Sequence, residues 1–216
     1  SLPGDAITSI KIDGVAHEFQ KLDGVIEDVT AIVLNVKSIV LKNHSDDYDK
    51  ILRVSAVGPC VVTAGDIEKD ADIEIFNPEQ VIATLAEGGS FNMEMTIANG
   101  RGYTRSEENK ETFKNNKMNV IAVDSLYSPI ERINYEVESA RVGQNNNFDK
   151  LILEVWTNGS ITPEEAISLA SRILIEHLEI VANVNNIANV TGLMKEKEED
   201  PTKQNTGLFF FRGKSN

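Results

Sequence analysis

The chain has 216 residues, 21 Lys and Arg and 34 Asp and Glu, so its formal net charge is −13. This length is enough for one large domain or two small ones, and 41% hydrophobic with 25% charged residues excludes wholesale disorder. The acidic balance disfavours a face that grips a nucleic-acid backbone, because such a face needs clustered positive charge.

Cysteine content and hydropathy indicate the cellular compartment of the protein. Cys60 is the one cysteine, so an internal disulfide and a cysteine-based zinc site are excluded. No apolar run is long enough for a membrane span, and the first residues lack the basic and apolar parts of a signal peptide. We therefore expect a cytoplasmic protein.

The first predicted elements are a strand and a helix. Alternation over 6–12 predicts the strand. Apolar residues at 25, 29, 32, 33 and 36 form one stripe of a helix near 24–37, with Asp23 as its cap and Lys37 in its last turn.

From about residue 39 the pattern changes to a period of two, which is typical of strands. The clearest alternation runs over 91–97 and ends near an Asn99-Gly100 turn. Residues 104–119 contain almost no apolar side chains and predict an exposed loop, after which strands are expected over 120–123, 133–137 and 151–155.

A long helix is predicted to start at Thr162. Thr162 and Glu165 form a capping box, and Pro163 occupies the first helical position. An apolar stripe of about five turns follows. From Asn183 the chain becomes Asn-rich and then highly charged, which is typical of a linker.

Patterns that would carry catalysis are missing. The three histidines lack metal-ligand spacing, and Cys60 is interpreted as a small core residue. Gly100-Arg101-Gly102 has neither spacing of a phosphate-binding loop. We predict no catalytic residue, cofactor or metal, although the scattered carboxylates leave a β-rich hydrolase or ligand-binding domain as the alternative.

Several blocks of sequence, in order from Ser1 to about Val181, resemble the amino-terminal domain of bacterial RNA polymerase alpha subunits. The blocks are 10–19, 24–28 with 34–37, 58–59 with 62–67, 99–103, 123–132, 149–151 and 157–166. The resemblance implies an α+β fold. A mainly β insert domain would span 4–128, with its one helix near 24–37. A dimerisation domain with the long helix would span 129–182, and a linker or tail 183–216.

The function that the resemblance implies is assembly. In the family, alpha has no active site for nucleotide transfer; it dimerises and then recruits the beta and beta-prime subunits of DNA-directed RNA polymerase. Four positions match the beta-prime contact regions: Lys37, Val123, Ile130 and Lys150. The helical stripe implied to serve both the chain's own sheet and a second copy consists of Ile167, Ala170, Leu174, Leu178 and Val181.

Three departures from the family pattern modify these expectations. The family carries a segment before Ser1 with its first dimer helix and main beta contacts, so we expect weakened dimerisation and little beta binding. Thr104-Arg105 replaces the family's Val-Pro-Ala. Residues 106–111 resemble the acidic activator-contact loop of some family members, with the acids diluted by Asn109 and Lys110, so activator contact at Glu107 and Glu108 is a further hypothesis. The DNA-binding domain of the family is missing too, so no DNA contact is expected.

Overall fold

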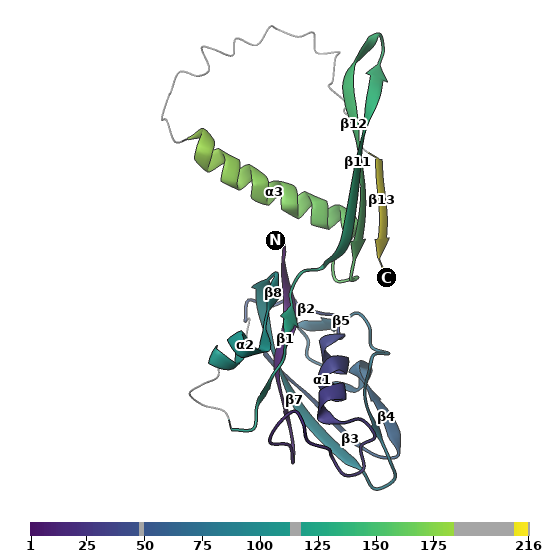
Figure 1. Ribbon diagram of the computed structural model, residues 1–216, viewed down its shortest axis with the longest axis vertical. Coiled ribbons are helices and arrows are strands. Elements are labelled where there is room, and N and C mark those ends of the chain that lie inside the picture. The colour runs from purple at the N-terminus through teal and green to yellow at the C-terminus, as the bar shows by residue number, and fades with distance from the viewer. Residues whose placement is uncertain (48–49, 113–117, 184–209, 216) are drawn as a thin grey trace. The chain divides into compact units, whose positions relative to one another are not determined.

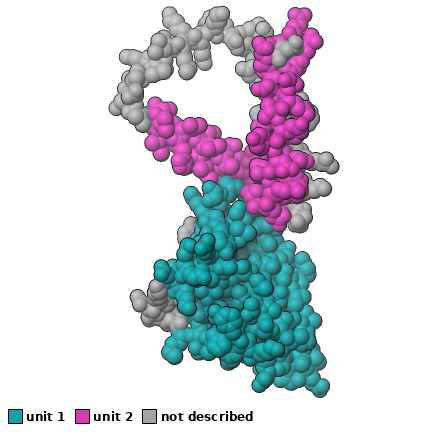
Figure 2. All heavy atoms as spheres, viewed as in Figure 1, with its two compact units in different colours: residues 1–129, 158–160 teal, residues 130–157, 161–216 magenta. Residues whose placement is uncertain are grey.

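A computed structural model describes residues 1–47, 50–112, 118–183 and 210–215 of the chain (Figure 1). The chain divides into two compact units (Figure 2). The first comprises Ser1–Pro129 with Asn158–Ser160, and the second comprises Ile130–Thr157 with Ile161–Asn216. Strands dominate both units and the second unit also contains a long helix, so the predicted α+β class is confirmed.

The first unit is built on a four-stranded antiparallel sheet of order β3-β7-β1-β9. Its strands are β1 (Pro3–Ile12), β3 (Lys50–Val57), β7 (Ser90–Arg101) and β9 (Ile121–Ala122). In β7 the alternation predicted over 91–97 is confirmed, because Phe91, Met93, Met95 and Ile97 are all nearly or fully buried. These side chains belong to one continuous hydrophobic core.

Smaller elements surround this sheet. Among the described residues of the unit, these are three two-stranded pairs and one short 3-10 helix. The pairs are β2 (Leu41–Asn43) with β5 (Ile73–Ile75), β4 (Cys60–Thr63) with β6 (Val81–Leu85), and β8 (Tyr103–Thr104) with β10 (Ser125–Leu126); the 3-10 helix is η1 (Ala64–Asp66).

Helix α1 (Val29–Lys37) is shorter than the predicted helix near 24–37. Asp28, and not Asp23, caps it, because the Asp28 side chain accepts a hydrogen bond from the Ala31 N–H at 2.8 Å. The preceding residues are engaged elsewhere: Val25 bridges to Leu85, and the Ile26 N–H donates to the Thr84 carbonyl. A backbone that pairs with a strand cannot also form helical hydrogen bonds, so the helix begins later.

The prediction of a loop over 104–119 is wrong in its first half, where α2 (Ser106–Thr112) forms. The helix has no apolar stripe, and Asn109 is its buried residue. The Asn109 amide donates to the Val123 carbonyl at 2.7 Å and to the Ser125 hydroxyl at 3.0 Å. A polar anchor of this kind leaves no hydrophobic periodicity in the sequence. Residues 113–117 lie outside the described residues.

The second unit contains a long hairpin of β11 (Ile130–Val142) and β12 (Asn145–Thr157). Within the tail that we expected to be a linker, β13 (Phe210–Ser215) pairs in parallel with β12. An edge strand offers unpaired N–H and C=O groups, which a six-residue segment satisfies here. The predicted linker residues 184–209 and 216 lie outside the described residues.

Helix α3 (Pro163–Ala182) begins as predicted. The Glu165 N–H donates to the Thr162 hydroxyl at 3.2 Å, and the Thr162 N–H donates to the Glu165 carboxylate at 3.1 Å. This confirms the capping box. Pro163 and Ala166 are buried, but Leu174 and Leu178 are more than 60% exposed, so the later turns do not cover the sheet of their own chain.

Candidate functional site

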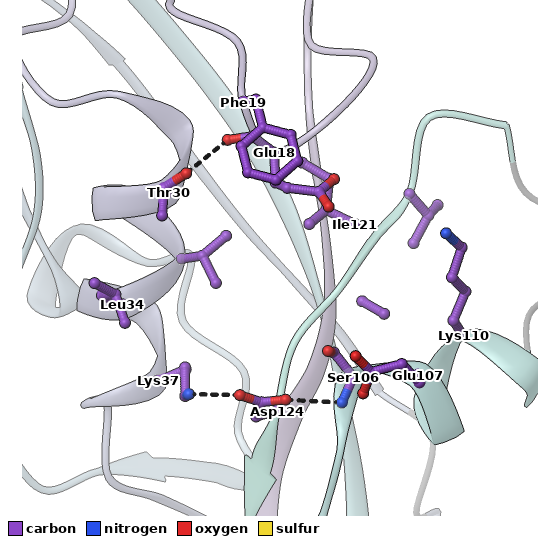
Figure 3. A pocket seen from close by; sticks show the side chains of 13 residues that line it. Glu18, Phe19, Thr30, Leu34, Lys37, Ser106, Glu107, Lys110, Ile121 and Asp124 are labelled. Carbon is purple, nitrogen blue, oxygen red and sulfur yellow. Dashed lines mark hydrogen bonds and ion pairs between the residues drawn. The ribbon is translucent and has the colours of Figure 1, made fainter.

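A groove in the first unit brings together two of the residues singled out by sequence. Its walls come from α1, the loop before it, α2 and the strand residues that precede Asp124, and it encloses about 290 Å³ (Figure 3). Phe19 and Leu34, which are 80% and 58% exposed, supply apolar surface, and Lys37 and Glu107 supply charge.

Lys37 is held by a carboxylate that the sequence analysis did not identify as a site residue. Lys37 Nζ lies 2.8 Å from Asp124 Oδ2, and the Ser106 N–H donates to Asp124 Oδ1 at 2.8 Å (Figure 3). Asp124 therefore joins the last residue of α1 to the first residue of α2. Both side chains of the ion pair are about 30% exposed, so the pair remains accessible at the surface.

The pKa of Asp124 is lowered to about 2. The hydrogen bond from Lys37 is the largest cause, followed by the hydrogen bond from the Ser106 N–H, and both favour the ionised form. Asp124 is thus a carboxylate throughout the physiological pH range, and it keeps the Lys37 ammonium in one position.

Val123 supports this arrangement from the interior. Its side chain is 1% exposed, its N–H donates to the Thr8 carbonyl at 2.9 Å, and its carbonyl accepts from Asn109. The Ser125 hydroxyl donates to the Ile7 carbonyl at 2.8 Å. These hydrogen bonds fix the backbone on both sides of Asp124. No local sequence pattern predicts that Asn109 and Ser125 make them.

Ile130 and Lys150 lie in the second unit. Ile130 is half-buried at the start of β11, opposite Thr157. Lys150 Nζ lies 3.0 Å from the carboxylate of Glu138, its partner across the hairpin. Glu138, which faces Lys150, is eight residues beyond Ile130 on the same strand. Ile130 and Lys150 are therefore roughly 25 Å apart along the hairpin. The structure does not bring these two residues into one site.

The five residues of the predicted dimer stripe differ in exposure along α3. Ile167 and Ala170 are half-buried, whereas Leu174, Leu178 and Val181 are 62%, 64% and 68% exposed. Ile175 and Ile180, which do not belong to the predicted stripe, are also more than half exposed. Leu174, Leu178 and Val181 follow the spacing of one helical face, so this face of the second half of α3 is apolar and exposed, which in soluble proteins marks an interaction site.

Glu107 and Glu108 lie in the first turn of α2 and are exposed. Among the described residues, no three His, Cys, Asp or Glu side chains gather as a metal site would require. Within the same residues, none of the helices combines the length and the apolar character needed to cross a membrane.

Comparison with known proteins identifies relatives. Residues 10–128, more than half of the chain, match the family described as the RNA polymerase Rpb3/RpoA insert domain. The chain is 53% identical to a DNA-directed RNA polymerase subunit alpha of Carboxydothermus hydrogenoformans over 200 residues, which is 93% of this chain and 63% of the relative. The subunits alpha of Moorella thermoacetica and Symbiobacterium thermophilum are 52% and 53% identical over 200 residues, again 93% of this chain and 63% and 62% of the relatives. The chain thus spans just under two thirds of these relatives.

Proposed function

The chain belongs to the RNA polymerase Rpb3/RpoA insert-domain family, and on this premise we propose that it works as an alpha subunit of a bacterial DNA-directed RNA polymerase. In this role it is a non-catalytic assembly subunit that dimerises and holds the beta and beta-prime subunits. The observation that carries the proposal is the apolar half of α3. Four of its apolar residues, Leu174, Leu178, Ile180 and Val181, expose more than 60% of their surface to solvent, which is costly unless a partner covers them.

We assign the dimer contact to this half of α3. A two-fold interface uses the same patch on both copies, and one long apolar helix can serve as such a self-complementary patch. Leu174, Leu178 and Val181 would lie at its centre, and Ile167 and Ala170 would serve the fold of their own chain, because they are half-buried already.

For the beta-prime subunit we propose contact through Lys37 and Lys150. Each ammonium group is fixed by a carboxylate, Asp124 and Glu138 respectively, so less side-chain entropy is lost when a partner binds. Val123 acts indirectly in this scheme, since its buried side chain positions Asp124. Ile130 would contribute the exposed part of its side chain. Glu107 and Glu108 remain candidates for activator contact, because both carboxylates are exposed on α2.

Co-purification tests the proposal. A tagged chain, extended to the length of the matched relatives, is co-expressed with the beta and beta-prime subunits of the same organism. We expect capture of beta and then beta-prime. Capture of neither subunit by a folded, extended chain would refute the assembly role.

A matched pair of variants tests the contact residues. Lys37→Ala with Lys150→Ala removes the two proposed contacts, and Lys21→Ala with Lys69→Ala removes two other exposed lysines as the control. The first pair is expected to keep beta and lose most beta-prime. Equal recovery of beta-prime with both pairs would rule out the contact assignment while leaving the assembly role standing.

A further inference from the structure

The chain contains two Asn-Gly dipeptides, Asn99-Gly100 and Asn158-Gly159. An Asn-Gly dipeptide can react with itself. The glycine main-chain nitrogen attacks the side-chain carbonyl carbon of the asparagine and closes a five-membered succinimide ring. Glycine permits the attack because it has no Cβ to hinder the approach. The structure places the two dipeptides in opposite settings.

Asn158 lies in the turn between β12 and α3, where residues 158–160 are all partly exposed. Asn158 Oδ1 accepts two hydrogen bonds from Ser160, from its N–H at 3.0 Å and from its hydroxyl at 2.6 Å. The first bond closes a ring of the Asx-turn type, and that ring contains both Asn158 Cγ and the Gly159 nitrogen. The ring therefore restricts how far Asn158 Cγ can rotate away from the Gly159 nitrogen that must attack it.

The two hydrogen-bond donors of Ser160 also stabilise the negative charge that the reaction creates. As the Gly159 nitrogen adds to Cγ, negative charge develops on Oδ1, the atom at which both donors already point. Preorganised donors at a developing oxyanion lower the barrier of such additions. We propose that Asn158 is a site of spontaneous succinimide formation and deamidation, and that Ser160 promotes it.

The reaction needs only solvent. The bond between the Gly159 nitrogen and Cγ forms, the Gly159 N–H proton is lost to water, and the Cγ–Nδ2 bond breaks to release ammonia. Water then hydrolyses one of the two ring C–N bonds and leaves aspartate or isoaspartate at position 158. The net change is the uptake of one water and the release of one ammonia, without oxidation or reduction.

Asn99 shows the opposite arrangement. Its amide nitrogen donates to Asp5 Oδ1 at 2.9 Å and to the Gly4 carbonyl at 3.2 Å. Its main chain is paired with β1 in β7, and the ring of Tyr127 lies directly against Gly100. The side chain is thus bonded through its leaving group and turned to the neighbouring strand, so ring closure is hindered in the folded chain.

The products have different consequences. An aspartate at 158 still accepts both hydrogen bonds from Ser160, whereas isoaspartate adds one carbon to the main chain shortly before Thr162, the cap of α3. Conversion to isoaspartate is therefore expected to disturb the start of the helix.

Peptide mapping of the aged chain tests the proposal. The 216-residue chain is incubated at pH 8, folded or in urea, and conversion at both sites is followed by mass spectrometry with isoaspartate detection. In urea the two sites should react at similar rates. In the folded chain Asn158 should convert at least about tenfold faster than Asn99, since a factor of ten requires only ~1.4 kcal/mol of barrier difference.

Ser160 variants test the promoting role. Ser160→Ala removes one donor and should slow conversion of Asn158 about fivefold in the folded chain, the equivalent of one ordinary hydrogen bond, and leave the rate in urea unchanged. Ser160→Thr keeps the hydroxyl and should restore the folded rate. Equal rates at Asn99 and Asn158 in the folded chain would overturn the site. An unchanged folded rate in Ser160→Ala would overturn the role of Ser160.

Discussion

Glu27 binds Thr84 through both of its carboxylate oxygens. Oε2 accepts from the Thr84 N–H at 2.6 Å, and Oε1 accepts from the Thr84 hydroxyl at 2.8 Å, although the residues are 57 positions apart. This contact holds the segment before α1 against β6, two residues before the helix begins at Val29. Charge-assisted pairs of this kind are among the stronger hydrogen bonds in proteins.

Removal of this contact should destabilise the first unit. Glu27→Ala is expected to lower the free energy of unfolding by about 2 kcal/mol, because a partly buried N–H loses its acceptor. Glu27→Gln should lose much less, since its amide oxygen can accept from the N–H and its amide nitrogen can donate to the hydroxyl. Urea unfolding measures both, with exposed Glu87→Gln as the neutral control. Equal losses in Glu27→Ala and Glu87→Gln would contradict this role.

The ion pair of Asp124 predicts a dependence of stability on pH. The folded pKa of about 2 lies below the ordinary value of 3.8, so the stabilisation is complete above about pH 5 and is lost as pH falls towards 2. Because the pair is partly exposed, the contribution is about 1–2 kcal/mol. Asp124→Asn should cost this amount at pH 7, and the cost should shrink steadily as the pH falls from 5 towards 2.

Urea unfolding at a series of pH values checks that prediction. The curves of the wild type and Asp124→Asn should converge in acid. Lys37→Gln serves as the partial control, because it removes the largest cause of the lowered pKa of Asp124 and leaves the Ser106 N–H in place. A constant difference between the wild type and Asp124→Asn from pH 7 to pH 2 would refute the ionic contribution.

Asn109 should control the formation of α2. Asn109→Ala removes the donor to the Val123 carbonyl and the Ser125 hydroxyl in a buried site, and is expected to cost about 2 kcal/mol. Hydrogen exchange should become faster at the amides of α2, while β7 remains protected. Lys110→Ala, an exposed change on the same helix, is the control. Unaltered exchange in Asn109→Ala would show that α2 does not depend on this anchor.

The apolar half of α3 should support self-association without supporting the fold of its own chain. Leu174→Glu with Leu178→Glu is expected to change the free energy of unfolding of the isolated chain by less than about 0.5 kcal/mol per site, because both side chains are already exposed. In the chain extended to the length of its relatives, the same pair should convert dimers to monomers in sedimentation experiments. Ser171→Glu, at an exposed polar position of α3, is the control. Dimers that survive the paired change would exclude this surface.

Features with a local physical origin were predictable from the sequence. The capping box of α3 depends on two residues three positions apart, Thr162 and Glu165, and the alternation of β7 depends on the two-residue repeat of a strand. The ordered blocks of the family resemblance were visible for the same reason, since they are short continuous runs.

The tertiary structure alone decided which polar groups that are distant in sequence form hydrogen bonds with each other. Lys37 and Asp124 are 87 positions apart, and Ser125 reaches the Ile7 carbonyl across 118 positions. No periodicity relates such residues, because a single hydrogen bond between distant segments leaves no repeat in either one. The start of α1 at Val29 and the existence of α2 followed from contacts of this kind. The sequence therefore determined the class of the fold, and long-range hydrogen bonds determined the local geometry of the candidate site.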